Sequence, residues 1–152
     1  MKYLLSACLL LSACSFHPLY ENHVADGVCI TAIPEATGYQ LKQALEKHFP
    51  QTSDCRYTLK ATTPSVKISD QSISNSNFIT MQRVSASSSY KLFDSNKKVV
   101  LTNTASTDGS SAVVTNPYST VVSVEKTIQN LVPILANQIS LHVTSYLDRE
   151  QQ

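Results

Sequence analysis

The chain has 152 residues, a formal net charge of +1 and a charged fraction of only 15%, where about 25% is usual in globular proteins. This length allows one ordinary domain, the balanced charge argues against nucleic-acid binding, and the three scattered glycines exclude a phosphate-binding loop. Because 21 serines and 14 threonines stand in for the missing charges, we expect a small strand-rich domain that is not an enzyme and holds no cofactor, metal ion or nucleic acid.

The first 13 residues have the organisation of a signal peptide. Lys2 supplies a positive charge, a short apolar run follows, and small residues stand directly before Cys14. This arrangement resembles the lipobox of bacterial lipoproteins, in which the cysteine becomes the first residue of the mature chain and carries the acyl groups that anchor it. Ser15 is permissive for transport to the outer membrane. The alternative is an ordinary secretory signal with an incidental cysteine.

The sequence divides into four parts. Residues 1–13 form the signal peptide, residues 14–26 a lipidated tether, residues 27–148 a single domain and residues 149–152 a short tail. Removal of the signal peptide leaves acidic and basic residues in equal number, so we expect no long-range attraction of an anionic ligand.

The first part of the domain predicts a strand, a helix and a second strand. Residues 28–33 are rich in β-branched side chains, and a proline ends them. Thr37 and Gln40 have capping-box spacing, which predicts a helix that starts near Thr37 and stops at Pro50. Residues 55–63 then alternate between apolar and polar side chains, as in a half-buried strand. The apolar stripe of the helix comprises Leu41, Ala44, Leu45, His48 and Phe49.

The middle of the domain predicts a long hairpin. Residues 69–77, rich in Ser and Asn, indicate a loop. Residues 78–93 predict a long strand, and residues 99–105 predict the strand that returns beside it. Residues 108–109 are typical of a loop, although residues 112–114 could extend the pairing. The inward face of the long strand comprises Val84, Ala86, Ser88, Tyr90 and Leu92.

The C-terminal segment predicts a long amphipathic helix capped by Ser119 or Thr120. Apolar residues recur every three or four positions from Val121 to Tyr146. Pro133 lies on the outer face, so it either kinks one helix or separates two short ones. The element order is therefore β-α-β-β-β-α. We expect an α+β fold in which two helices pack on one face of a four-stranded sheet and the other face meets water.

Two cysteines, Cys29 and Cys55, remain after the signal peptide and Cys14 are set aside. They lie at the edges of strands that flank the first helix, and an oxidising periplasm favours a disulfide between them. The alternative is two free thiols. The four histidines do not pair with Cys, Asp or Glu at metal-ligand spacing.

Basic residues lie on or near the predicted strands. Either they keep an exposed sheet face solvated, or they contact an anionic partner such as a phosphorylated lipid. Arg83 is expected to face outward, because the inward set begins at Val84, and a guanidinium can hold a phosphate through two hydrogen bonds. The basic residues are Arg56, Lys60, Lys67, Arg83 and Lys91.

Short motifs along the chain resemble those of the lipopolysaccharide (LPS) assembly lipoproteins of the LptE type, in their short form. The first is similar to the C-G-F-x-P-L-Y opening of that family, with Ser15 in place of the usual glycine. The others are similar to its first helix, its A-x-Y-x-L-x-D strand and its last helix. The first motif comprises Cys14, Phe16, Pro18, Leu19 and Tyr20. The others span residues 39–45, 89–94, 116–122 and 135–139.

The resemblance implies an outer-membrane lipoprotein, held in the membrane by its lipid anchor, whose partner is the large β-barrel that translocates LPS. Members of the family lie partly inside that barrel, help it assemble and assist LPS delivery to the outer leaflet. The first motif, in the tether, would then contact the barrel partner. Lys60, Lys67, Arg83 and Lys91 are candidates for contacts with LPS. Two alternatives stay open: an auxiliary lipoprotein of a phospholipid transport system, and a pilotin-like lipoprotein for another pore.

Overall fold

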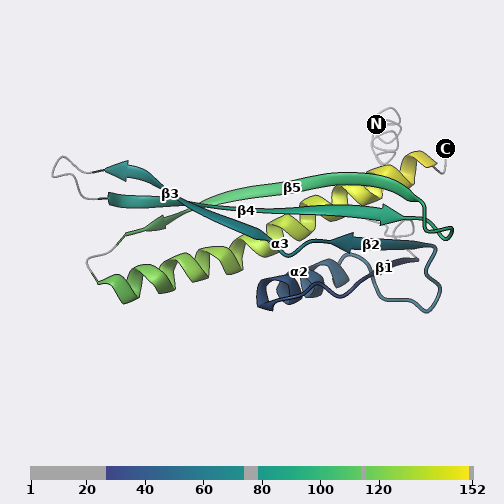
Figure 1. Ribbon diagram of the computed structural model, residues 1–152, viewed down its shortest axis with the longest axis horizontal. Coiled ribbons are helices and arrows are strands. Elements are labelled where there is room, and N and C mark those ends of the chain that lie inside the picture. Colours follow the sequence, from purple (N-terminus) through teal and green to yellow (C-terminus); the bar gives the residue numbers. More distant parts are fainter. Residues whose placement is uncertain (1–26, 74–78, 114–115, 151–152) are drawn as a thin grey trace, which may run out of the picture.

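The computed structural model describes residues 27–73, 79–113 and 116–150. These residues form an elongated α+β domain, in which both helices lie on the same side of one sheet (Figure 1). The predicted fold class and layer arrangement are confirmed. The elements are β1 (Val28–Ile30), α2 (Ala36–Glu46), β2 (Tyr57–Ala61), β3 (Ser65–Ile73), β4 (Ile79–Phe93), β5 (Val99–Ala112) and α3 (Pro117–Glu150).

The sheet is organised around β4, the longest strand. Strand β5 pairs with β4 along one side, whereas β2 and β3 share its other side, one after the other. All three pairings are antiparallel, and β1 adds a short parallel strand outside β2. The described sheet therefore has five strands, one more than predicted, because the expected second strand is followed by an additional one.

The junction between β2 and β3 lies at Thr62. The Ser88 hydroxyl donates a hydrogen bond of 2.7 Å to the Thr62 carbonyl, and the Ser89 amide donates one of 3.1 Å to the Thr62 hydroxyl. Pro64 follows, and a proline cannot donate to a strand ladder. The local bonds satisfy the main chain where the register changes, so β2 and β3 behave as one interrupted strand.

The prediction of a loop over residues 69–77 is wrong for residues 69–73, which belong to β3; residues 74–77 lie outside the described part of the chain. The loop expected at residues 108–109 is also wrong, since β5 runs through it. In both places the long β4 strand offers hydrogen-bond partners that outweigh the turn preferences of Ser, Asp and Gly.

Helix α2 begins one residue before the predicted cap. Glu35 occupies the N-cap position with a φ of 67°, and no side chain caps the helix there, so the expected capping box of Thr37 and Gln40 is wrong. The Tyr39 amide instead donates to the Glu35 carbonyl at 2.9 Å. The predicted apolar stripe does reach the core: Leu41, Leu45 and Phe49 are fully buried.

Helix α3 continues without interruption through Pro133, so the alternative of two short helices is wrong. Pro133 is exposed, as predicted, and lies inside the helix. The helix starts at Pro117, a favoured first position, and the Asn116 side chain accepts a hydrogen bond of 3.0 Å from the Tyr118 amide. Asn116 therefore takes the capping role expected of Ser119 or Thr120.

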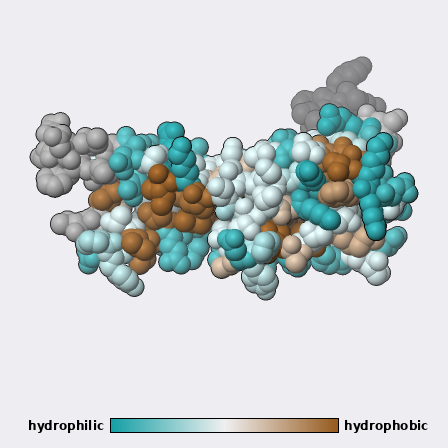
Figure 2. Space-filling model, in the orientation of Figure 1, coloured by the Kyte–Doolittle hydropathy of each residue, from teal (hydrophilic) through white to brown (hydrophobic). Residues whose placement is uncertain are grey.

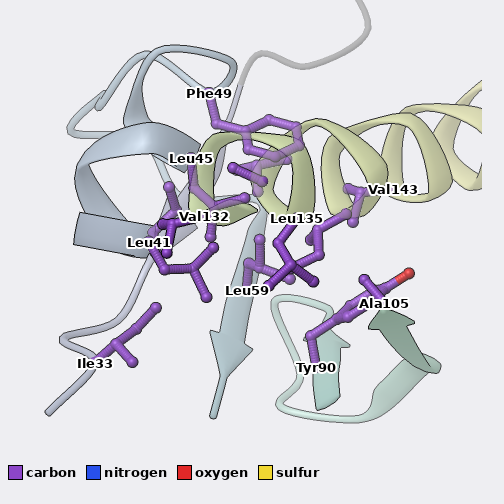
Figure 3. Packing of buried hydrophobic residues seen from close by; sticks show 14 of the residues in the cluster. Ile33, Leu41, Leu45, Phe49, Leu59, Tyr90, Ala105, Val132, Leu135 and Val143 are labelled. Atoms are coloured by element: carbon purple, nitrogen blue, oxygen red, sulfur yellow. The ribbon is translucent and has the colours of Figure 1, made fainter. Parts of the chain in front are cut away.

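The core lies where α2, α3 and the inner face of the sheet meet. Leu41 and Leu45 of α2 point toward α3, and Leu59 of β2 lies beneath them (Figure 3). The inward set predicted for β4 is confirmed, since all its members are at most 1% exposed. Because both helices pack on this inner face, the opposite face of the sheet remains open.

The turn between β4 and β5 carries a strained residue. Asp94 accepts hydrogen bonds from the amides of Asn96 and Lys98, at 2.9 and 2.8 Å, while Lys97 has a φ of 62°. Lys97→Gly is therefore expected to raise the free energy of unfolding by about 0.5–1 kcal/mol, because glycine adopts this conformation without a steric penalty. Urea unfolding measures the gain. Ser95→Gly, at a neighbouring position without positive φ, is the control and should not stabilise.

Candidate functional site

A disulfide joins Cys29 of β1 to Cys55, which lies shortly before β2. The two Cα atoms are 5.5 Å apart, because β1 and β2 run parallel with Cys29 opposite Thr58. The β-α-β connection thus brings the two cysteines together, and the predicted disulfide is confirmed. The bond ties the three-residue strand that follows the tether to the rest of the sheet.

Tyr90 and His142 connect the sheet to α3. The Tyr90 hydroxyl lies 2.7 Å from Nδ1 of His142, and the Tyr90 side chain is 1% exposed. Burial raises the pKa of the Tyr90 phenol to about 12, and a hydrogen bond with Asn103 opposes this shift in part. Tyr90 is therefore a neutral structural contact under ordinary conditions.

The Tyr90 pKa predicts a loss of stability in alkali. Because the phenol ionises near pH 10 when unfolded and near 12 when folded, its contribution to stability is complete below pH 10 and is lost as the pH rises from 10 to 12. Tyr90→Phe should therefore lose less stability than the wild type between pH 8 and pH 11, as measured by urea unfolding. An equal loss in both proteins would contradict this assignment.

The sheet face turned away from the helices is open and largely uncharged. Serine and threonine hydroxyls occupy its middle, and those of Ser89 and Thr104 lie 2.9 Å apart across β4 and β5. Figure 2 shows a pale surface of near-neutral hydropathy across the middle of the molecule. The outward residues of β4 from Met81 onward are Met81, Arg83, Ser85, Ser87, Ser89, Lys91 and Phe93.

Lys60 and Lys91 lie directly opposite each other in neighbouring strands of this face. The Lys60 ammonium also lies 4.9 Å from the centre of the Phe93 ring. A shallow cavity of about 350 Å³ is lined by these three residues and by Thr102 and Thr104, among others, and none of the described residues that line it is acidic. Like charges placed directly opposite destabilise a sheet, so this pair is suited to binding an anion between the two ammonium groups.

Arg83 and Lys67 lie at the other end of the same face. Arg83 faces outward, as predicted, but its Nε lies 3.8 Å from a carboxylate oxygen of Asp108, and both side chains are more than half exposed. Lys67 lies opposite Ser85, which in turn faces Asp108 on β5. The Asp108 carboxylate therefore offsets part of the positive charge here, unlike at Lys60 and Lys91.

The four candidate cations thus share one face but form two separate groups. Arg83 and Lys91 are eight positions apart on β4, or roughly 27 Å of extended chain. Sequence reasoning missed Phe93 and Thr102, which the alternation of the long hairpin could have placed beside Lys91. It also missed Asp108, because that residue was expected in a loop. Arg56, the fifth of the basic residues predicted on or near the strands, precedes β2.

The remaining expectations concern the lipid anchor, the tether, metal ions and membrane-spanning helices. Cys14 and the tether motif lie outside the described residues. In the described ranges, no three His, Cys, Asp or Glu side chains gather in a way that could hold a metal ion. Within the same ranges, no helix has the length and apolar character needed to cross a membrane.

Solved structures of bacterial lipoproteins share this fold. Rare lipoprotein B from Shewanella oneidensis has a TM-score of 0.68 at 9% identity, over 84% of this chain and 98% of that one. A protein from Caulobacter crescentus described as a lipoprotein has a TM-score of 0.64 at 16% identity, over 82% and 92%. A minor lipoprotein from Acinetobacter baumannii has a TM-score of 0.58 at 16% identity, over 78% and 91%.

These likenesses establish a fold that recurs among bacterial lipoproteins. No sequence-family profile and no curated protein sequence matches the chain. The class defined by fold and geometry is therefore a small domain, folded like bacterial lipoproteins, with an open hydroxyl-rich sheet face that carries two groups of cations.

Proposed function

We propose that the protein is an outer-membrane lipoprotein of the LptE type, which plugs and helps assemble the LPS-translocating β-barrel and assists LPS delivery to the outer leaflet. The observation that carries the proposal is a lipoprotein fold over nearly the whole domain in a chain whose lipobox and motifs follow that family's order. The function is one of binding and positioning, without a catalytic step.

The open sheet face supports this proposal physically. The lumen of an outer-membrane barrel is polar, and a charge confined there without a partner is costly. A plug is therefore best served by neutral hydroxyl groups, which fill the middle of the open face. The ammonium groups of Lys60 and Lys91 would bind a phosphate group of LPS, and Arg83 and Lys67 are a second candidate contact.

Co-purification tests the proposal. The tagged full-length lipoprotein is purified from detergent-solubilised outer membranes, and its stoichiometric partners are identified by mass spectrometry. A single large β-barrel that also binds LPS is the expected partner. Recovery of phospholipid-transport components, or of an unrelated pore, would overturn the proposal in favour of one of the alternatives.

The phospholipid-transport alternative calls for an apolar groove between sheet and helices that can hold lipid tails. A shallow cavity of about 560 Å³ between the two helices is lined by polar side chains, among them Gln40, Gln43 and Gln129, together with Ala44, Val132 and Pro133. This cavity lies between the helices and has a mixed lining, so it does not supply the apolar groove between sheet and helices that the phospholipid-transport alternative needs. The pilotin-like alternative has no observation in its favour.

Lipidation of Cys14 gives a further prediction. Cys14→Ala should leave an uncleaved precursor or a soluble periplasmic form, because the modified cysteine is both the cleavage point and the anchor. Intact-mass analysis of the wild type should show the added acyl chains, and the variant should lack them. An unmodified Cys14 in the mature wild-type protein would contradict the lipoprotein assignment.

A further inference from the structure

One edge of the sheet is incomplete beside β3. Strand β1 lies outside β2 for three residues only, and in the described residues β3 pairs with β4 alone. Among the described strands, none therefore continues the position of β1 alongside β3 (Figure 1). An exposed strand edge of this kind can accept another extended segment through main-chain hydrogen bonds.

The register shows which main-chain groups of β3 face this edge. The Thr62 amide donates to the Ser89 carbonyl at 2.9 Å, so the odd-numbered residues of β4 direct their main-chain groups toward β2 and β3. Lys67 lies opposite Ser85 and is thus bonded to β4, whereas the main-chain groups of Val66 and Ile68 point away from it.

The side chains of Val66 and Ile68 are exposed to solvent. Val66 and Ile68 lie opposite Ala86 and Val84, on the inner face of the sheet, yet they are 36% and 48% exposed. Helix α3 packs on β4 and β5, and α2 packs on α3 and β1, so neither described helix covers β3.

We propose that β3 binds an extended segment of a partner protein as an added antiparallel strand. The segment places apolar side chains opposite Val66 and Ile68, an acidic side chain opposite Lys67 and a basic side chain opposite Asp70. The apolar pair covers the inner face, and the acidic group pairs with the lysine on the outer face. A register shift between Asp70 and Ser72 limits the added strand to residues 65–70.

Two antiparallel registers that would pair β3 with a second copy of this chain are unfavourable. Antiparallel self-pairing centred on Lys67 sets two lysines opposite each other, and like charges there are unfavourable. Pairing centred on Ile68 sets Asp70 opposite Val66, so a carboxylate would be placed against an apolar side chain. The charge pattern of β3 therefore favours a partner with a different sequence.

A labelled synthetic peptide tests the proposal. Its five central residues are KSVEV in one-letter code. In antiparallel pairing the lysine faces Asp70, the two valines face Ile68 and Val66, and the glutamate between them faces Lys67. The full mature protein is titrated against it, and binding is followed by fluorescence anisotropy. A control peptide, KVEVS, moves both valines to the other face and is expected to bind about tenfold more weakly or not at all.

Variants of the protein separate strand addition from general adhesion. Ile68→Thr should weaken binding of the first peptide about tenfold, whereas Ile134→Thr, on exposed α3 surface, should not. Lys67→Glu should lower affinity for this peptide about threefold and raise it for one carrying lysine in place of glutamate. Circular dichroism confirms that each variant is folded.

Three results would overturn the proposal. The first is equal binding of the two peptides, and the second is binding that Lys67→Glu leaves unchanged toward both charge versions. The third is concentration-dependent dimerisation in sedimentation that Ile68→Thr abolishes, which would assign the edge to a second copy. None of these results depends on whether the protein acts in the LPS translocon.

Discussion

Replacing both Cys29 and Cys55 by serine is expected to lower the free energy of unfolding by about 3–4 kcal/mol. The disulfide closes a loop between residues 26 positions apart, which contains the whole of α2. In the chain-entropy account, that loop restricts the unfolded chain, so its removal makes unfolding more favourable. Urea denaturation of the oxidised wild type and the double variant measures the difference.

Reduction provides the matched control. The wild type under reducing conditions should unfold at the same urea concentration as the double variant, whereas the variant should not respond to reductant. Hydrogen exchange should also report the change locally, because β1 has only three residues and depends on the disulfide. If reduction left the wild-type stability unchanged, the disulfide would have no stabilising role.

Periodicity predicted most of the buried surfaces of this fold, although Val121, where the predicted repeat of α3 begins, is 64% exposed. Alternation along β4 identified the inward side chains from Val84 to Leu92, and the helical repeat in α3 identified Leu131, Leu135 and Ile139, which are buried. These patterns are readable because each of the two elements has one face against the core. The periodic signal therefore reports burial as much as secondary structure.

The same reasoning explains why residues 69–73, the second half of β3, were predicted as a loop. No described helix covers its inner face, so Asp70 and Val66 share that face and no clean alternation exists. Its strand conformation comes from pairing with β4, which is non-local. A sequence pattern that records burial cannot identify a strand that is held mainly by its backbone.

The spatial arrangement of the candidate site could not be predicted from the sequence either. Its basic residues were identified, but the pairing of Lys60 with Lys91 depends on the register between β2 and β4. A shift of one residue in that register would have put Lys60 on the opposite face from Lys91. The nearness of Asp108 to Arg83 likewise depends on β5 continuing past its expected end.

These two arrangements lead to unequal expectations for LPS binding. The double variant Lys60→Glu, Lys91→Glu should weaken LPS binding by about ten- to a hundredfold. It replaces two ammonium groups that have no acidic residue in their cavity by carboxylates, which repel phosphate. Arg83→Glu should weaken it by a smaller factor, because Asp108 already offsets the charge of Arg83. Binding is measured on purified protein at fixed salt, since the attraction of exposed charges falls as salt rises.

Lys126→Glu is the matched control for Arg83→Glu, because it makes the same change of charge at an exposed position of α3, away from the open face. It should leave LPS binding unchanged, and all the variants should still recover the β-barrel. A larger loss with Arg83→Glu than with the lysine double variant would move the phosphate contact to Arg83 and Lys67. Loss of the barrel with LPS binding intact would instead assign Lys60 and Lys91 to the protein interface, because the open sheet face would then meet the barrel wall and not the lipid.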